Sequence, residues 1–320
     1  MMKLSFSING WKDYSWQDFT DLASEIGFKG IELHNVLESE LSDKNGPFHK
    51  YNMAATLRQL REKNLTIPCF DTSCVSENAE YIAKCVDFAS SIRVPYVRVY
   101  ASGNCDNARD NVVNCLSKVV DYAASKSVTV LIETCGMFSD TAALRDVLME
   151  FACDSLAALW DVYHTFCENG EDTEKTITNL GAYIKHVHLK DSAVFDGERE
   201  YCLIGEGEVP VDIVVNALSS VNYSGFISLE WNPDWMPELT EIDVIFAHFA
   251  QYMQKFQAPS RKKSHLYSNK RGTGKFVWKK EDLSEKTFSQ VLDKMVEEFP
   301  DQYAFKYTTL DYTRTYSEFR

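Results

Sequence analysis

The stretch IKHVHLKDS, residues 184–192, has the apolar residues of a buried β-strand together with several ionisable side chains. Successive side chains of a strand point to opposite faces, so His186, His188 and Lys190 would share one face. Ionisable groups are rarely buried without a partner or a function. The stretch therefore predicts a fold in which one face of a buried strand lines a polar site.

Seven further apolar runs of similar length occur before and after this one. They are KLSFSI (3–8), GIELH (30–34), IPCFDTS (67–73), YVRVYAS (96–102), TVLIETC (129–135), LAALWDVYH (156–164) and FISLEW (226–231). Helical patterns such as WQDFTDLASEIGF separate the runs, and EIDVIFAHFAQYMQKF follows the last one. Eight βα units in about 255 residues predict an α/β fold, the (β/α)8 or TIM barrel, with a short C-terminal extension. An open doubly wound sheet is the alternative, but no glycine-rich phosphate-binding sequence follows the first run.

The C-terminal ends of these runs carry side chains of the kinds that bind metal ions. Four consecutive runs end in such a residue, namely Glu133, Asp161, His188 and Glu230. Catalytic residues of a TIM barrel come from the C-terminal ends of its strands, so these four are expected to meet at the mouth. Three carboxylates that converge on one imidazole would repel one another without a cation. Oxygen ligands with a single nitrogen favour Mn²⁺, Mg²⁺ or Co²⁺ over a structural Zn²⁺.

Each of these residues also has a structural interpretation. A glutamate at a strand end commonly caps the next helix or pairs with a base, which is the alternative for Glu133 and Glu230. Asp161 could cap the helix that follows it. Capping does not explain why four consecutive strands end this way, so a metal site is the preferred interpretation. His186, one layer deeper, is expected to pack or to support a ligand rather than to bind the metal itself.

The composition indicates a globular protein and argues against several classes. The chain has 320 residues, 45% of them hydrophobic, which is enough to bury a large core. Its net charge of −14 argues against a nucleic-acid partner, because phosphate binding needs a basic surface. No apolar run reaches the roughly 18 residues of a membrane span, and no signal peptide is recognisable. The nine cysteines include no CxxC pair, so the prediction is a cytoplasmic protein with reduced thiols.

The motifs IETCG, WDVYH, HVHLKD, GEGEVP and FISLEW resemble, in order and spacing, those of the xylose-isomerase-like TIM barrels known as sugar phosphate isomerases/epimerases. The resemblance covers residues 3–256, and the group includes ketose 3-epimerases, hydroxypyruvate isomerase, inosose dehydratase and endonuclease IV. It implies one divalent metal ion at the four strand ends, Mn²⁺ in the first place, with Mg²⁺, Co²⁺ or Zn²⁺ as alternatives. It also implies substrate contacts from His164, Lys190, Glu32 and His34.

The implied chemistry is the isomerisation or epimerisation of a sugar, a polyol or a sugar phosphate. Such a reaction removes a proton from a carbon beside a carbonyl group, and a metal ion stabilises the resulting enediolate. Glu133 and Glu230, expected on strands that face each other across the mouth, would act as base and acid. Trp11 in the loop WKDYSW would cover the apolar face of the sugar, with packing of this loop against the barrel as the alternative. A hydride shift and a lyase reaction of the inosose dehydratase type both stay open.

Two departures from the family patterns bear on the substrate. Endonuclease IV has extra histidines on the third and fourth strands, whereas the corresponding runs here end in Asp71-Thr72-Ser73 and Tyr100-Ala101-Ser102, so DNA repair is not expected. Ketose epimerases have a further carboxylate shortly after the first metal glutamate, for which this chain offers Asp140. The resemblance therefore does not identify the substrate.

The C-terminal part of the chain differs in composition from the rest. Residues 261–280 contain eight basic and no acidic residues, which predicts an exposed linker, and their GTGK lacks the P-loop spacing. Residues 284–320 resemble the start of an AMP-forming acyl-CoA synthetase. The predicted organisation is a barrel at 1–257, a linker at 258–283 and an incomplete synthetase-like segment at 284–320. The alternative for the last segment is a helical hairpin that docks on the barrel.

A second function class is compatible with the sequence. A non-catalytic barrel could bind a small ligand and regulate or scaffold a fused synthetase. Metal affinity separates the two classes, because only the enzyme needs a divalent ion. The expected partner is a small sugar or polyol, together with a fused synthetase domain in a longer chain, and a homo-oligomer is left open.

Overall fold

A computed structural model describes residues 2–75, 78–101, 107–257, 286–301, 303–307 and 312–320. The chain divides into two compact units, Met1–Phe256 and Gln257–Arg320. The predicted linker at 258–283 lies entirely outside the described residues, so the predicted boundaries of the last two segments stay a prediction.

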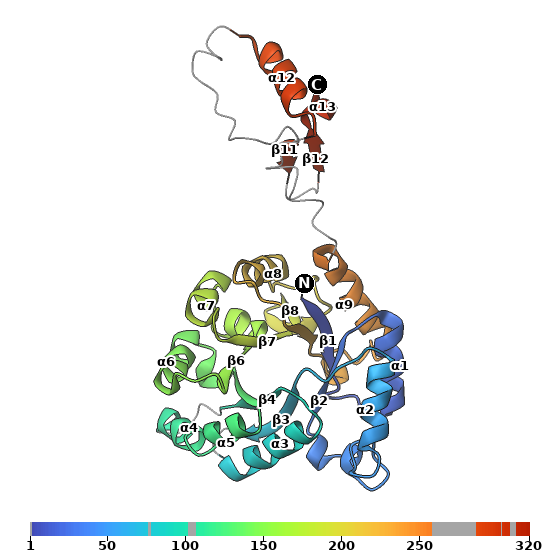
Figure 1. Cartoon of the computed structure of the whole chain (residues 1–320), viewed down its shortest axis with the longest axis vertical. Coiled ribbons are helices and arrows are strands. Elements are labelled where there is room, and N and C mark those ends of the chain that lie inside the picture. The colour runs from blue at the N-terminus through green and yellow to red at the C-terminus, as the bar shows by residue number, and fades with distance from the viewer. Residues whose placement is uncertain (1, 76–77, 102–106, 258–285, 302, 308–311) are drawn as a thin grey trace. The chain divides into compact units, whose positions relative to one another are not determined.

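The first unit is a closed barrel of parallel strands surrounded by helices (Figure 1). Its strands are β1 (Lys3–Ser7), β2 (Gly30–His34), β3 (Phe70–Val75), β4 (Tyr96–Tyr100), β5 (Thr129–Glu133), β6 (Leu156–Asp161), β7 (Ile184–Leu189) and β10 (Phe226–Leu229). Neighbours around the barrel follow the chain order, and β10 closes the ring by pairing with β1. The predicted TIM barrel is therefore confirmed.

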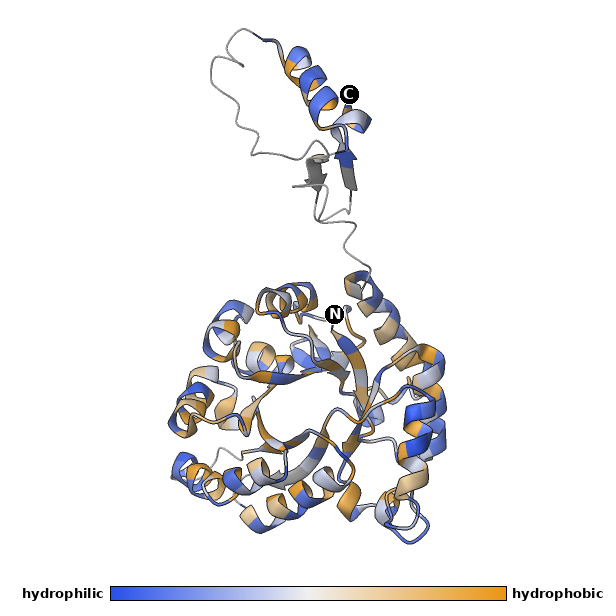
Figure 2. Cartoon of the chain, viewed as in Figure 1, coloured by the Kyte–Doolittle hydropathy of each residue, from blue (hydrophilic) through white to orange (hydrophobic). Residues whose placement is uncertain are grey.

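Helices cover the outside of the ring and carry both hydrophobic and hydrophilic residues (Figure 2). They are α1 (Trp16–Ile26), α2 (Met53–Glu62), α3 (Ala79–Ser91), α4 (Ala108–Leu116), α5 (Val120–Ser125), α6 (Thr141–Phe151), α7 (Thr173–Leu180), α8 (Val211–Ser220) and α9 (Ile242–Gln257). A capping box between Ser15 and Asp18 begins α1, and Gly27 ends it with a φ of 96° that favours glycine. On α9, Phe246 packs against Phe6 of β1, with ring centroids 4.3 Å apart.

The interior of the barrel has an apolar lower layer and a polar upper layer. Cys69, Leu131, Ala157 and Leu159 form a small buried cluster separate from the main core, and Tyr96 packs against it. Alternation along the strands places Glu133 and Asp161 on the same faces as Leu131 and Leu159, one step nearer the C-terminal ends. Polar residues thus gather at the mouth because the strands change from apolar to polar on their inner face.

The seventh run forms two strands rather than one. β7 ends at Leu189, and Asp191 begins a hairpin made of β8 (Asp191–Phe195) and β9 (Glu198–Cys202) that the sequence did not predict. The buried Asp191 carboxylate accepts hydrogen bonds from the backbone N–H groups of Gly205, Gly207 and Val209 at 2.9–3.1 Å. A Cβ atom on Gly207 would lie 2.2 Å from this carboxylate, so the motif GEGEVP needs glycine there. Asp191 therefore anchors the loop that follows the hairpin.

The second unit contains α12 (Phe288–Glu298), β11 (Tyr303–Tyr307), β12 (Tyr312–Thr315) and α13 (Tyr316–Phe319). The two strands pair antiparallel. The resemblance of this segment to an acyl-CoA synthetase, and the fused synthetase partner, stay predictions.

The described helices and cysteines bear on membrane insertion and on disulfide formation. None of the helices in the described ranges is long and apolar enough to cross a membrane. Seven of the nine cysteines are shown as free thiols, and four of these, Cys69, Cys85, Cys115 and Cys202, are buried.

Candidate functional site

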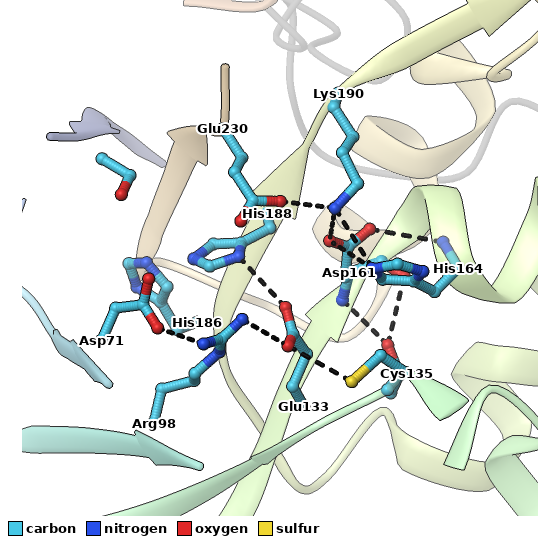
Figure 3. A network of polar contacts seen from close by, with 12 residues as sticks. Asp71, Arg98, Glu133, Cys135, Asp161, His164, His186, His188, Lys190 and Glu230 are labelled. Carbon is cyan, nitrogen blue, oxygen red and sulfur yellow. Dashed lines mark hydrogen bonds and ion pairs between the residues drawn. The ribbon is translucent and has the colours of Figure 1, made fainter. Parts of the chain in front are cut away.

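The four predicted metal ligands all lie buried at the C-terminal ends of their strands (Figure 3). Glu133, Asp161 and His188 each present one ligand-type atom, and these three atoms lie within 4.8 Å of one another. Glu230, which follows β10, does not belong to this group and instead forms an ion pair with Lys190. The structure therefore brings three of the four predicted ligands together and places the fourth beside them.

Lys190 occupies the centre of one half of the site. Its ammonium group lies 2.6 Å from Oδ2 of Asp161 and 3.2 Å from Nε2 of His164, in addition to its contact with Glu230. Burial alone would lower the pKa of Lys190, but the charges of Asp161 and Glu230 raise it well above its usual value. Lys190, predicted to contact substrate, is thus a buried cation held between two predicted ligands.

Arg98 of β4 supplies a second buried cation, which the sequence analysis missed. Its guanidinium donates to Oε2 of Glu133 at 2.6 Å and also forms an ion pair with Asp71. Burial would lower the pKa of Arg98, but Asp71 and Glu133 raise it well above its usual value. The signal was an arginine inside the apolar run YVRVY, where Val97 and Val99 are fully buried.

These two cations change the charge balance expected at the mouth. Burial raises the pKa of Glu133, but the nearby Arg98 charge outweighs it and holds this pKa well below its usual value. For Asp161, burial raises the pKa and Lys190 more than reverses that effect. Both carboxylates are therefore ionised at neutral pH, and buried charges of this kind are stable because they are paired.

Glu32 of β2 lies beneath the imidazole of His188 rather than at the rim. Its carboxylate accepts from Nε2 of His188 at 2.9 Å and lies 3.0 Å from Nε2 of His186. All three side chains are fully buried. A carboxylate on one ring nitrogen orients a histidine whose other nitrogen binds a metal. Ligand-type atoms of Glu32, His186 and His188 also lie within 4.8 Å of one another, so these residues form a second possible metal-binding group. The prediction that His186 packs or supports a ligand and the predicted substrate contact of Glu32 both stay predictions.

One ring nitrogen of His188 and one oxygen of Glu133 have no hydrogen bond. These atoms, Nδ1 of His188 and Oε1 of Glu133, lie 3.4 Å apart without hydrogen-bond geometry and are buried. Apart from the ion pair that they form with each other, these atoms have no polar partner among the described residues, and buried polar atoms without a hydrogen bond call for an explanation, such as an ion. Glu133 offers an anionic oxygen and His188 a nitrogen, and the third atom of the group belongs to Asp161. The donor set fits a divalent cation.

Asp161 caps the turn that follows it with one oxygen and contacts Lys190 with the other. Its Oδ1 accepts from the backbone N–H groups of Tyr163 at 2.9 Å and His164 at 3.3 Å, as an N-capping aspartate does. Its Oδ2 points to Lys190. The next turn, η4 (His164–Glu168), is π-helical, a geometry common at functional sites. In this turn, Nδ1 of His164 lies 2.6 Å from Glu168, and the side chain is 20% exposed at the mouth.

Two further predicted residues have clear positions. Nδ1 of His34 lies 2.7 Å from Asp71, which in turn bonds to Arg98. Asp140 is the N-cap of α6, where its side chain accepts from the N–H of Ala142 at 3.2 Å. Asp140 therefore has a local structural role.

The aromatic residues beside the polar cluster are not those predicted. Trp11 is only 4% exposed and packs edge-on against Tyr14 and Phe246, as the packing alternative stated. Instead, the Lys190 ammonium lies 5.4 Å from the ring centroid of Tyr163 and 5.9 Å from that of Trp235. Tyr201 of the hairpin stacks on Trp235 with centroids 4.1 Å apart. We call Tyr163, Tyr201 and Trp235 the aromatic wall.

The two predicted catalytic glutamates come from well-separated strands. β6 and β7 separate β5 from β10 in the ring, so Glu133 and Glu230 come from strands three steps apart. In an eight-stranded barrel, opposite strands are four steps apart. The strands of the two carboxylates are therefore one step short of opposite, and the catalytic roles of Glu133 and Glu230 stay a prediction.

Comparison with known proteins identifies the family. The family described as "Xylose isomerase-like TIM barrel" matches residues 20–251, and the chain belongs to this family. The fold is also that of the probable 3-DHS dehydratase AsbF from Bacillus anthracis, with 20% identity, a TM-score of 0.65 and coverage of 79% of this chain and 99% of that one.

Two other solved structures are similar in fold. The D-allulose 3-epimerase from Methylomonas sp. in complex with D-allulose has 15% identity and a TM-score of 0.63, covering 79% of this chain and 96% of that one. The IOLI protein with a binding zinc atom has 16% identity and a TM-score of 0.66, covering 81% and 100%. At these identities the similarity concerns the fold alone.

Proposed function

We propose that this protein is a divalent-metal-dependent isomerase or epimerase of a sugar, a polyol or a sugar phosphate. The observation that carries the proposal is the pair of buried atoms without hydrogen bonds, Oε1 of Glu133 and Nδ1 of His188, with Asp161 beside them. Family membership and the resemblance to an allulose epimerase support the reaction class.

The metal would be held by Glu133, Asp161 and His188, with Glu230 as the fourth proposed ligand. A divalent ion there supplies positive charge that stabilises the negative charge developing on substrate oxygen when a carbon-bound proton is removed. Mn²⁺ is the first choice for this oxygen-rich set, and the zinc atom of the IOLI structure is a reason to include Zn²⁺ in any test.

Arg98, Glu230 and Lys190 would each have a separate role in the reaction. Arg98 holds Oε2 of Glu133 and keeps this carboxylate ionised, which suits a ligand and makes it a weak base. Glu230 is the better candidate for proton transfer, because its carboxylate lies outside the group of three ligand-type atoms. Lys190 would hold the carboxylates of Asp161 and Glu230 in fixed positions.

The aromatic wall would contact the apolar face of the substrate. Tyr163 is 6% exposed, whereas Tyr201 and Trp235 are partly exposed beside Lys190. Flat aromatic side chains provide contact area with little loss of conformational entropy, and they exclude water from the reacting groups. His164 lies at the same edge and would bind a hydroxyl group.

A combined metal and exchange experiment tests this proposal. Protein stripped of metal is titrated with Mn²⁺, Co²⁺ and Zn²⁺, and the loaded forms are incubated in deuterated water with ketoses and ketose phosphates, D-allulose among them. The expected result is one bound ion per chain, an epimeric or isomeric product, and deuterium at one substrate carbon. Failure of all three ions to bind stoichiometrically would overturn the proposal and favour a non-catalytic ligand-binding barrel.

A dehydration reaction is separated in the same experiment. It also begins with removal of a proton beside a carbonyl, so deuterium exchange alone does not distinguish the two. The product does, because a dehydratase forms a carbon–carbon double bond that absorbs ultraviolet light and an epimerase does not.

A further inference from the structure

We propose that a cavity at the opposite, N-terminal end of the barrel binds a small organic anion with a flat apolar body. The cavity has a volume of about 500 Å³. It lies where the strands begin, between the start of β1, the loops before β3, β4 and β7, and the loop 221–225 before β10. We call it the N-terminal cavity. Pockets of this size typically hold small molecules.

The charge of the N-terminal cavity is opposite to that of the chain. Lys3 and Lys185 line it, and none of its lining residues is acidic, although the chain carries a net charge of −14. Both lysines are exposed, and neither forms an ion pair within the described ranges. An acidic protein that keeps two unpaired ammonium groups at one cavity offers a local site for an anion.

Part of the cavity wall is aromatic and apolar, beside the polar residues Asn222 and Ser224. Phe226, Tyr96 and Tyr223 line it together with Pro68 and Pro95. The hydroxyl of Tyr223 donates to the backbone carbonyl of Phe226 at 2.7 Å, which fixes the ring at the start of β10. Burial raises the pKa of both tyrosines, so both phenols stay neutral and add no negative charge. This lining suits a planar apolar group whose acidic end reaches the lysines.

The N-terminal cavity is distinct from the candidate active site. Tyr96 packs against the apolar cluster of Cys69, Leu131, Ala157 and Leu159. That cluster lies below the polar layer, since Leu159 pairs in register with His186. Binding at the cavity therefore needs neither the metal nor the catalytic carboxylates, and its test is independent of the proposed reaction.

The probe for the test is 8-anilinonaphthalene-1-sulfonate, which combines aromatic rings with one sulfonate and fluoresces when bound. The full chain is compared with the double variant Lys3→Gln/Lys185→Gln and with a matched control, Lys12→Gln/Lys118→Gln. The control removes two exposed lysines that lie outside the cavity and form no ion pair in the described part of the chain. We expect at least tenfold weaker binding for the cavity variant and less than a twofold change for the control.

Removing two positive charges could weaken binding of an anion at any site on the protein. A steric variant, one that fills the cavity and keeps both lysines, separates binding in the cavity from this general effect of charge. Ala182→Trp places a large side chain at the cavity without removing a lysine, because Ala182 is an exposed lining residue. This variant should bind the probe more weakly than the wild type. Its melting temperature should stay within 2–3 °C of the wild-type value, which corresponds to a change of about 1 kcal/mol or less in the free energy of unfolding. Equal affinity in the wild type, the cavity variant and the steric variant would overturn the proposal, since the probe would then bind elsewhere, for example at the apolar residues of α12.

Discussion

Oε1 of Glu133 lies 3.4 Å from Nδ1 of His188, and neither buried atom makes a hydrogen bond. The other oxygen of Glu133 is held by Arg98, and the other nitrogen of His188 is held by Glu32. Each side chain is thus fixed from behind, so that its free atom points to a shared position. This arrangement would suit a pair of metal ligands, because their orientation would be set before an ion binds.

Replacing His188 with Ala should lower the affinity for Mn²⁺ or Zn²⁺ at least tenfold. The substitution removes a nitrogen donor, and loss of even a supporting partner of a metal ligand typically costs about 10- to 100-fold. Isothermal titration of metal-free protein measures the change. His49→Ala, in the loop before α2 and away from the cluster, is the control and should bind as the wild type does. Unchanged affinity in the His188 variant would show that the ion does not bind here.

Replacing Arg98 with Leu should destabilise the metal-free protein by about 3–5 kcal/mol, because Asp71 and Glu133 would remain buried without their cation. The free energy of unfolding in urea gives the value. Arg58→Leu removes an exposed arginine of α2 and should change stability by no more than about 0.5 kcal/mol. A similar small effect at both positions would mean that the two carboxylates are neutral in the folded protein.

The ion pair between His34 and Asp71 should make stability depend on pH. Burial lowers the pKa of His34, but Asp71 reverses this effect and raises it above its usual value of 6.5. A raised pKa in the folded state means that the stabilisation is complete below pH 6.5 and disappears as the pH rises through the folded value. The stability difference between the wild type and His34→Gln should therefore be larger at pH 6 than at pH 9. A difference that grows with pH would contradict the pairing.

The predicted fold and ligand set came from features that are local in the sequence. Each βα unit has its own apolar run and helical pattern, and a parallel barrel brings all strand ends to one face, so Glu133, Asp161 and His188 could be grouped without coordinates. Alternation on β7 likewise placed His186 and His188 on one face. Their contact with Glu32, over 150 residues away in the chain, depends on barrel closure.

The features that were missed depend on contacts between elements. The partners of Arg98 and Lys190 lie on other strands, and no local pattern shows which carboxylate each cation pairs with. The hairpin β8–β9 was hidden because its first residues continue the apolar run of β7, and only the backbone contacts of Asp191 reveal the break. Trp11 and Trp235 both follow a strand, so the sequence alone does not show which of them lies at the mouth. Trp11 is buried because it packs against Phe246 of α9, a contact between distant parts of the chain.

Cutting the chain after Gln257 should leave a folded barrel. The first compact unit ends at Phe256, and α9 contributes Phe246 and Phe249 to the core before that point. The melting temperature of the shortened protein, measured by circular dichroism, should lie within a few degrees of that of the full chain. Aggregation or a loss of helical signal beyond that of the removed segment would show that residues 258–320 contribute to the stability of the barrel.

The two glutamates at the mouth should respond differently to replacement by Gln. Oε1 of Glu133 belongs to the three-atom group, so Glu133→Gln should weaken metal binding as well as turnover. Glu230 lies outside that group, and Gln keeps one oxygen that can serve as the fourth ligand, so Glu230→Gln should retain most of the metal affinity and lose general-base catalysis, worth about 10²- to 10⁴-fold in rate.

Solvent deuterium separates the remaining mechanisms. If Glu230 removes the proton, the wild type incorporates deuterium from the solvent into the substrate carbon, and the metal-loaded Glu230→Gln variant does not. A hydride shift predicts no deuterium in the product even for the wild type, because the hydrogen never exchanges with water. Exchange that continues at the wild-type rate in the Glu230 variant and stops in Glu133→Gln at saturating metal would assign the base to Glu133, despite the pKa lowered by Arg98.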